Sequence, residues 1–122
     1  MYPGEWEKAE CRGEMLAHLR VMACDPLGGR LAYCDGGVID QSKCSPSRNY
    51  KPLDCISYPF FPALSGGILH LLVDDSRCPL PSVALRQHHN YVLLRWSAVL
   101  QLDARIAEWL LQLSLDGYRP YK

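Results

Sequence analysis

Cysteine and histidine are the residues of this chain best suited to chemistry, since thiolate and imidazole groups bind metals and act as nucleophiles or bases. The six cysteines are Cys11, Cys24, Cys34, Cys44, Cys55 and Cys78, and the four histidines are His18, His70, His88 and His89. Structural zinc sites usually use closely spaced ligand pairs such as C-x-x-C, whereas successive cysteines here are separated by 12, 9, 9, 10 and 22 residues. Only His88 and His89 are adjacent, and neighbouring residues of a helix point about 100° apart. The spacing therefore predicts no metal site and no cofactor.

Nucleophilic catalysis would combine a cysteine with a histidine and an aspartate. The candidates are Cys34, Cys55 and Cys78 as nucleophiles, His70, His88 and His89 as bases, and Asp74 and Asp75 as orienting groups. No spacing selects one combination, and the sequence contains no G-x-S-x-G, phosphate-loop, dinucleotide-binding or H-E-x-x-H motif. We therefore assign no catalytic residue, and a small Cys/His/Asp enzyme or metal-binding protein stays as an alternative.

An even number of cysteines also suits the disulfide framework of a secreted protein. If residues 30–34 and 38–43 form a hairpin, Cys34 and Cys44 lie roughly 20 Å apart at about 3.3 Å per residue, which is beyond the reach of a disulfide. The first seven residues lack the basic and apolar regions of a secretory signal. We expect a cytosolic protein whose thiols are mostly buried as small hydrophobic groups, with a secreted, disulfide-held domain as a further alternative.

The charge of the chain limits its partners. Thirteen basic residues balance thirteen acidic ones, so no overall field attracts nucleic acid or an anionic membrane. The segment 41–53 carries Lys43, Arg48 and Lys51 without an acidic residue, but three dispersed charges are typical of a solvated loop. The charge-free run between Arg95 and Asp103 is too short to span a bilayer. A protein partner or a second copy of the chain is expected, rather than nucleic acid or a membrane.

The helices and strands expected from the sequence determine where these side chains lie. Apolar residues at helical spacing predict a first helix over residues 5–23. Strands are expected at 30–34, 38–43 and 68–73, and the proline-interrupted segment 58–62 is expected at a sheet edge or in a packed loop. A long helix is expected over residues 90–117, with Asn90 as its N-cap and Gly117 as its stop. The pattern predicts one α+β domain over residues 1–122, in which a small antiparallel sheet, made of a hairpin plus a further strand, is packed by an N-terminal helix and a long C-terminal helix.

The expected C-terminal helix is unusual because its apolar arc covers more than half of its circumference, whereas an ordinary surface helix has a stripe of roughly 100°. Asp103 falls near the centre of this arc, where an unpaired carboxylate is costly. We expect it to form an ion pair, with Arg95 among the candidates, or to face another chain. The arc is then either sandwiched inside the domain or covered by a partner, with Arg95, Leu102, Asp103 and Trp109 as the predicted protein-binding residues.

The wide arc and the missing catalytic signature together predict a non-enzymatic protein-binding module. Such a module acts as an adaptor, a chaperone or an inhibitor of a larger partner. Its long C-terminal helix is expected to form part of a dimer or heteromeric interface.

Overall fold

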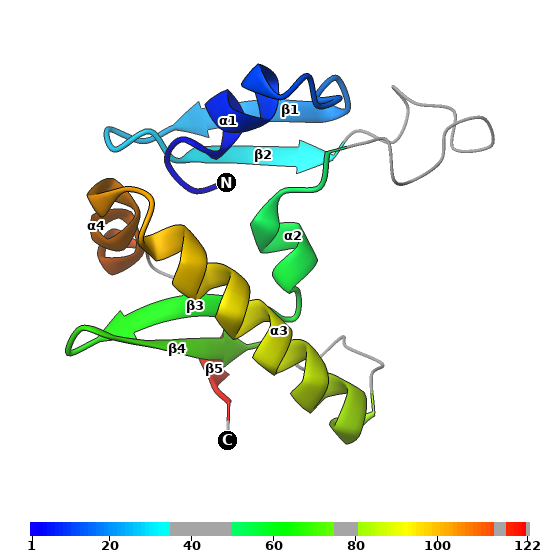
Figure 1. The fold of residues 1–122 in the computed structure, drawn as a ribbon, viewed down its shortest axis with the longest axis vertical. Helices are drawn as coiled ribbons and strands as arrows, with labels where there is room; N and C mark the ends of the chain where they lie inside the picture. Colours follow the sequence, from blue (N-terminus) through cyan, green and yellow to red (C-terminus); the bar gives the residue numbers. More distant parts are fainter. Residues whose placement is uncertain (35–49, 75–80, 114–116, 122) are drawn as a thin grey trace. The chain divides into compact units, whose positions relative to one another are not determined.

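The computed structural model describes residues 1–34, 50–74, 81–113 and 117–121. The chain divides into two compact units, Met1–Pro52 and Leu53–Lys122, and each is described here by itself. The described residues form two small antiparallel sheets and four helices (Figure 1). The α+β class, with an N-terminal and a C-terminal helix, is thus confirmed, although the strands divide between two sheets. The expectation of a single domain over residues 1–122 stays a prediction.

Unit 1 contains a short helix and a two-stranded sheet: α1 (Glu5–Cys11), β1 (Leu19–Cys24) and β2 (Arg30–Cys34). The prediction of a helix over residues 5–23 is wrong, because Gly13 adopts a left-handed φ of 72°. The amides of Gly13 and Glu14 donate to the carbonyls of Glu10 and Ala9, which is the Schellman pattern that ends helices. The residues that follow are therefore available to form β1.

The β1–β2 hairpin turns at residues 25–29, where the Asp25 side chain accepts hydrogen bonds from the amides of Leu27 and Gly29 at 2.9 and 3.0 Å. The predicted strand at 30–34 is confirmed as β2. It pairs with the preceding strand, from Leu19↔Cys34 to Cys24↔Arg30, and this pairing was not predicted. The predicted turn at 35–37 and the strand at 38–43 lie outside the described residues.

Unit 2 contains three helices and a three-stranded sheet. Its elements are α2 (Leu53–Ser57), β3 (Phe60–Ser65), β4 (Ile68–Val73), α3 (Ser82–Leu100), α4 (Ala104–Gln112) and β5 (Arg119–Pro120). The strand order is β3-β4-β5, so Pro62 lies on an edge strand, where its missing amide is tolerated. The β3–β4 turn is a pair of glycines, Gly66 and Gly67, with φ of 58° and 78°, as a tight two-residue hairpin turn requires.

The core of unit 2 lies between its hairpin and its helices. Alternate residues of the paired strands are buried, among them Phe60, Leu71 and Val73, and α3 crosses the hairpin (Figure 1). Trp96 of α3 is fully buried and donates from its indole Nε1 to Ser57 Oγ at 2.8 Å. Ser57 in turn donates to the carbonyl of Leu53 at 2.6 Å. This chain of hydrogen bonds satisfies the polar atoms of the core.

The expected long helix over residues 90–117 is wrong at both ends and in its middle. The helix begins at Ser82, with Pro81 rather than Asn90 at the N-cap position, and it ends at Leu100. Asp103 is extended (φ −157°, ψ 127°) and accepts a hydrogen bond from the amide of Arg105, which caps α4. The aspartate side chain competes for a backbone amide and so starts a new helix. No described helix is both long and apolar enough to cross a membrane.

Candidate protein-binding surface

The side of α3 that faces away from the core of unit 2 is apolar. Val83, Tyr91 and Leu94 are 69%, 45% and 74% exposed, and at about 100° per residue they fall within an arc of about 80°. The buried residues Val92 and Trp96 lie on the opposite side of the helix. We call the exposed arc the outer face of α3 and define it as Val83, Gln87, Tyr91, Leu94 and Ala98. Three large apolar residues exposed on one side of a helix make that side a candidate binding surface.

Tyr91 lies at one edge of this arc, midway along its length, and its neighbours hold its ring in place. The His88 ring stacks on it, with centroids 6.2 Å apart and planes 22° apart, and the guanidinium of Arg95 lies 5.9 Å from the ring centroid. His88 is itself fixed, because its Nε2 lies 3.0 Å from the carbonyl oxygen of Tyr58. A tyrosine that is already ordered loses less entropy on binding.

The charges beside the outer face have a single sign. Arg86 and Arg95 belong to α3, and the sequence of α3 contains no aspartate or glutamate. Tyrosine and arginine are enriched among the residues that dominate interface energies. An apolar face bordered by arginines is complementary to an apolar surface bordered by carboxylates.

Each of the four predicted binding residues lies in a different setting. Arg95 lies beside Tyr91 on α3, and Leu102, which is 57% exposed, lies in the turn between α3 and α4. Asp103 caps α4. Trp109 is only 6% exposed and packs in the core of unit 2, with its ring centroid 6.4 Å from that of Phe61. Arg95 and Leu102 are therefore accessible to a partner, whereas Trp109 serves the core.

The expectation that Asp103 forms an ion pair is confirmed, whereas its predicted place near the centre of an apolar arc on one continuous helix is wrong. Its carboxylate accepts hydrogen bonds from the side chain of Arg105 at 2.7 and 2.9 Å, so the ion-pair partner is Arg105 and not Arg95. The side-chain hydrogen bonds and the backbone hydrogen bond from Arg105 lower the pKa of Asp103 below its ordinary value. The carboxylate therefore requires no partner chain.

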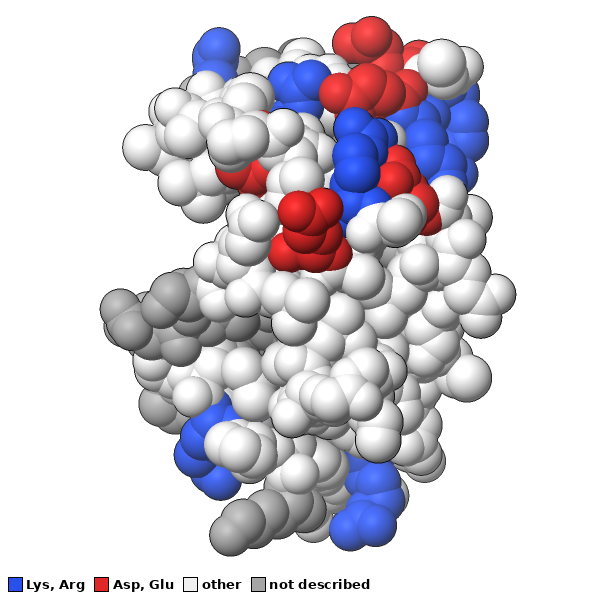
Figure 2. Space-filling view, turned by 90° about the vertical axis from the view of Figure 1, so that its left-hand side faces the viewer, with Lys and Arg blue, Asp and Glu red and all other residues white. Residues whose placement is uncertain are grey.

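The other exposed apolar residues of unit 2 are more scattered. Ile68 of β4 and Leu111 of α4 are exposed. Figure 2 views unit 2 from the side of the β3–β4 turn, and the surface on this side is mostly uncharged. The exposed residues that surround Leu111 on α4 include Glu108 and Gln112. Single exposed leucines of this kind are normal on protein surfaces.

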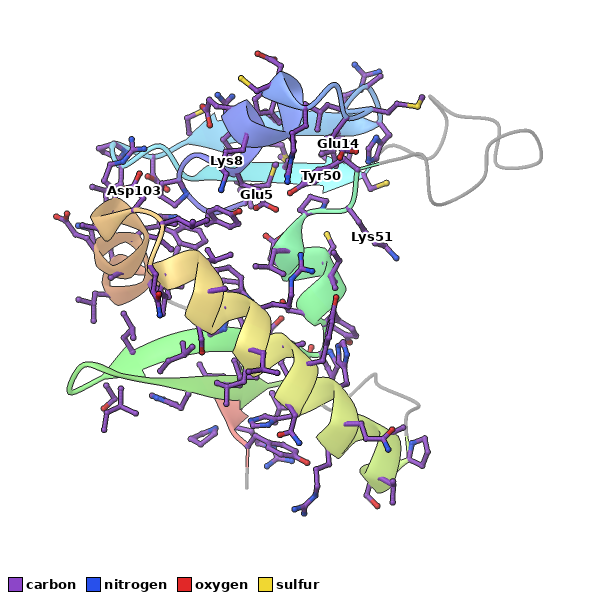
Figure 3. The ribbon with its side chains drawn as sticks, in the orientation of Figure 1. Glu5, Lys8, Glu14, Tyr50, Lys51 and Asp103 are labelled. Atoms are coloured by element: carbon purple, nitrogen blue, oxygen red, sulfur yellow. The ribbon has the colours of Figure 1, made fainter. Side chains whose placement is uncertain are left out.

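Unit 1 contains a buried polar cluster. The Glu5 carboxylate is fully buried, and it accepts hydrogen bonds from the Tyr50 hydroxyl at 2.7 Å and from the Tyr2 amide at 3.2 Å (Figure 3). His18 is also buried, with its Nε2 2.8 Å from the Tyr50 carbonyl oxygen. Burial raises the pKa of Tyr50 far above its ordinary value, and the charge of Glu5 raises it further. The cluster joins three separate segments, which is a structural role.

The cysteines differ from expectation in their burial. Cys11, Cys24, Cys34 and Cys55 are exposed thiols, so the prediction that most are buried small groups is wrong for the described cysteines. Cys44 and Cys78 lie outside the described residues. Within the described segments, no group of three histidine, cysteine, aspartate or glutamate side chains is arranged to hold a metal ion.

Comparison of the chain with protein-family models, with curated proteins and with solved structures yields no match. The function is therefore argued from the residues themselves. Arg95 and Leu102 were predicted from an apolar arc on one continuous helix, and that arc did not include Val83, Tyr91 or Leu94. The signal that could have found the outer face is the apolar spacing Val83, Tyr91, Leu94, which extends N-terminal to Asn90.

Proposed function

We propose that the chain is a non-enzymatic protein-binding module whose docking surface is the outer face of α3. The observation that carries this proposal is that α3 is apolar on two opposite sides, of which only one is buried in its own unit. Keeping Val83 and Leu94 in water forgoes roughly 25 cal/mol for each Å² of apolar surface. A partner that covers the face recovers this free energy.

The composition of the face supports a protein as the occupant. Tyr91 offers a large apolar ring that is held between His88 and Arg95, and such preordered aromatic side chains are typical anchors of protein interfaces. Leu102, in the turn that follows α3, is a further exposed apolar residue. Adaptor, chaperone and inhibitor roles all use a surface of this kind.

The test places the photo-reactive residue p-benzoylphenylalanine at position 94 of the full chain, in cells that express it. The matched control places it at position 108, an exposed position on α4. We expect a discrete cross-linked species from position 94, with the mass of a dimer or of a complex with one partner. No such species is expected from position 108.

A second substitution makes the result specific to the proposed surface. Tyr91→Ala removes the aromatic ring of the face and should abolish the cross-link from position 94. Equal cross-linking from positions 94 and 108, absence of a species from position 94, or a cross-link indifferent to Tyr91→Ala would each refute the proposal. Sedimentation of the purified chain then separates a dimer from a heteromeric complex.

A further inference from the structure

A pocket of about 530 Å³ in unit 2 shares no lining residue with the outer face of α3. It is lined by Asp54, Cys55, Tyr58, Phe61 and Tyr118. These residues come from three places in the chain: α2 with the residue after it, strand β3, and the segment that leads into β5. Three of the five side chains are aromatic, one is a carboxylate, and among the described residues that line the pocket none is basic.

The aromatic walls are positioned by the fold. The Phe61 ring contacts the rings of Trp96 and Trp109 at centroid distances of 6.1 and 6.4 Å, so it is anchored to the core. Tyr118 packs against Phe61 with centroids 6.1 Å apart and planes 62° apart. The carbonyl of Tyr58 is held by His88 of α3 at 3.0 Å. The rings of Phe61 and Tyr118 are therefore held in place before any ligand arrives, which lowers the cost of binding.

Two carboxylates, those of Asp54 and Asp74, lie near the Tyr118 hydroxyl. Burial raises the pKa of the Tyr118 hydroxyl, and the charge of Asp74, the Tyr58 phenol and the charge of Asp54 raise it further. The phenol thus stays neutral at physiological pH, and carboxylates lie close enough to act on it. Aromatic ring faces carry negative electrostatic potential and attract cations, most strongly where water is partly excluded.

We infer that this pocket binds an alkylated ammonium group, held by the rings of Tyr58, Phe61 and Tyr118 with Asp54 at the rim. Quaternary and methylated ammonium groups suit such a site because they are apolar enough to enter it and still carry a positive charge. A free small cation and a methylated lysine side chain present the same chemistry to the pocket.

Binding is measured by calorimetric titration of the full chain with choline and with its neutral isostere, 3,3-dimethylbutan-1-ol. The two differ in charge and hardly in shape, so the cation should bind about tenfold more tightly if the rings and carboxylate act on its charge. Equal affinities would mean a merely apolar pocket and would overturn the inference. Failure of choline to bind would overturn it as well.

Substitutions separate the ring faces from the space they enclose. Tyr58→Leu and Tyr118→Leu keep an apolar side chain and remove the ring, so each should weaken choline binding by about fivefold to tenfold. Tyr58→Phe should leave the affinity nearly unchanged. Tyr33→Leu, at an exposed tyrosine of β2 that does not line the pocket, serves as the control, and circular dichroism checks that each variant is folded. Undiminished binding by folded Tyr58→Leu and Tyr118→Leu variants would exclude this pocket as the site.

The contribution of the Asp54 carboxylate to choline binding can be measured separately. Asp54→Asn should weaken choline binding by about twofold to fivefold at low ionic strength, and added salt should reduce this difference. Choline should also slow alkylation of the Cys55 thiol, followed on its peptide by mass spectrometry. Unaltered Cys55 alkylation at a choline concentration that saturates the calorimetric signal would contradict binding in this pocket.

The source of the cation is distinguished by a second titration. A short peptide with trimethyllysine is compared with the same peptide carrying unmodified lysine. Tighter binding of the trimethylated peptide than of choline points to a protein side chain, and the reverse order points to a free small cation. Either result supports the inference. Equal affinities for the two peptides, together with equal affinities for choline and its neutral isostere, would contradict it.

Discussion

Helices α3 and α4 follow one another in the chain but use their apolar residues differently. In α4 the buried residues Ile106, Trp109 and Leu110 form one side, and apart from Leu111 the exposed side is built from small, charged and amide residues. In α3 the buried side is matched by an apolar side in water, with Tyr91 and Leu94 exposed. A helix with one apolar side is explained by its own core, whereas a helix with two such sides requires a second explanation.

The comparison also shows why a continuous helix was misleading. Superposing the two buried sides on a single helical wheel produces an arc wider than either helix has. Because the helix is interrupted at Asp103, the residues of α3 and α4 do not belong to one helical wheel. Each helix therefore presents its own narrower apolar face to the core. The exposed apolar residues of α3, Val83, Tyr91 and Leu94, lie outside that arc, and the proposed function depends on them.

The largest expected effect concerns the side of α3 that is buried. Trp96→Ala should lower the free energy of unfolding by about 3 to 5 kcal/mol, because it leaves a cavity and removes the hydrogen bond to Ser57. Urea denaturation followed by circular dichroism measures it. A loss no larger than that of an exposed leucine variant would show that α3 has no core side, and the comparison with α4 would fail.

A second prediction concerns the buried hydrogen bond between Tyr50 and Glu5 in unit 1, whose contribution to stability is compared with that of the packing of Trp96. Tyr50→Phe should cost about 2 kcal/mol, since it deprives the buried Glu5 carboxylate of a donor. The raised pKa of Tyr50 stabilises the fold below its ordinary value of 10.0, and this contribution is lost as the pH rises above 10. The difference in stability between wild type and Tyr50→Phe should therefore shrink in alkaline solution. A difference that is constant from pH 7 to pH 11 would contradict the assignment.

The third prediction tests the boundary between the two helices. Asp103→Ala should destabilise α4 by less than Tyr50→Phe destabilises unit 1, and Asp103→Asn should recover most of the loss because asparagine also caps helices. The pKa of Asp103 is lowered in the fold, so its charge stabilises above pH 3.8 and this contribution is lost as the pH falls below that value. Thermal melts at pH 7 and pH 3 check both statements. Equal stability of the Ala and Asn variants at pH 7 would exclude a capping role.

The smallest expected change in stability is at the outer face of α3. Leu94→Asp should alter the free energy of unfolding by no more than about 0.5 kcal/mol, as is usual for an exposed site, and the similarly exposed Leu111→Asp on α4 should do the same. Only Leu94→Asp should reduce docking, measured by the cross-link from position 83. A large loss of stability in Leu94→Asp would place this residue in a core and remove the basis for the comparison.

Local signals in the sequence determined a good part of the fold. The glycine pair at residues 66–67 set the β3–β4 turn, and the segment 68–73, apolar except for His70, formed a strand as predicted. These features depend on neighbouring residues alone, because backbone conformation and alternation are local properties. The helix stop at Gly13 and the helix cap at Asp103 are local signals as well. Both are visible in the sequence, but the apolar periodicity on which the predicted helices were based continued past them.

Other features were decided only when distant segments met. Which strand pairs with Arg30–Cys34, which side of α3 is covered, and which rings surround Phe61 all depend on residues tens of positions apart. Trp109 illustrates the reason: its type and spacing suit an interface and a core equally, and burial against Phe61 assigns it to the core of unit 2. The sequence by itself determined how much apolar surface the chain carries and at what spacing. Tertiary packing alone decided which part of it stays in water, because burial is a property of the whole set of contacts.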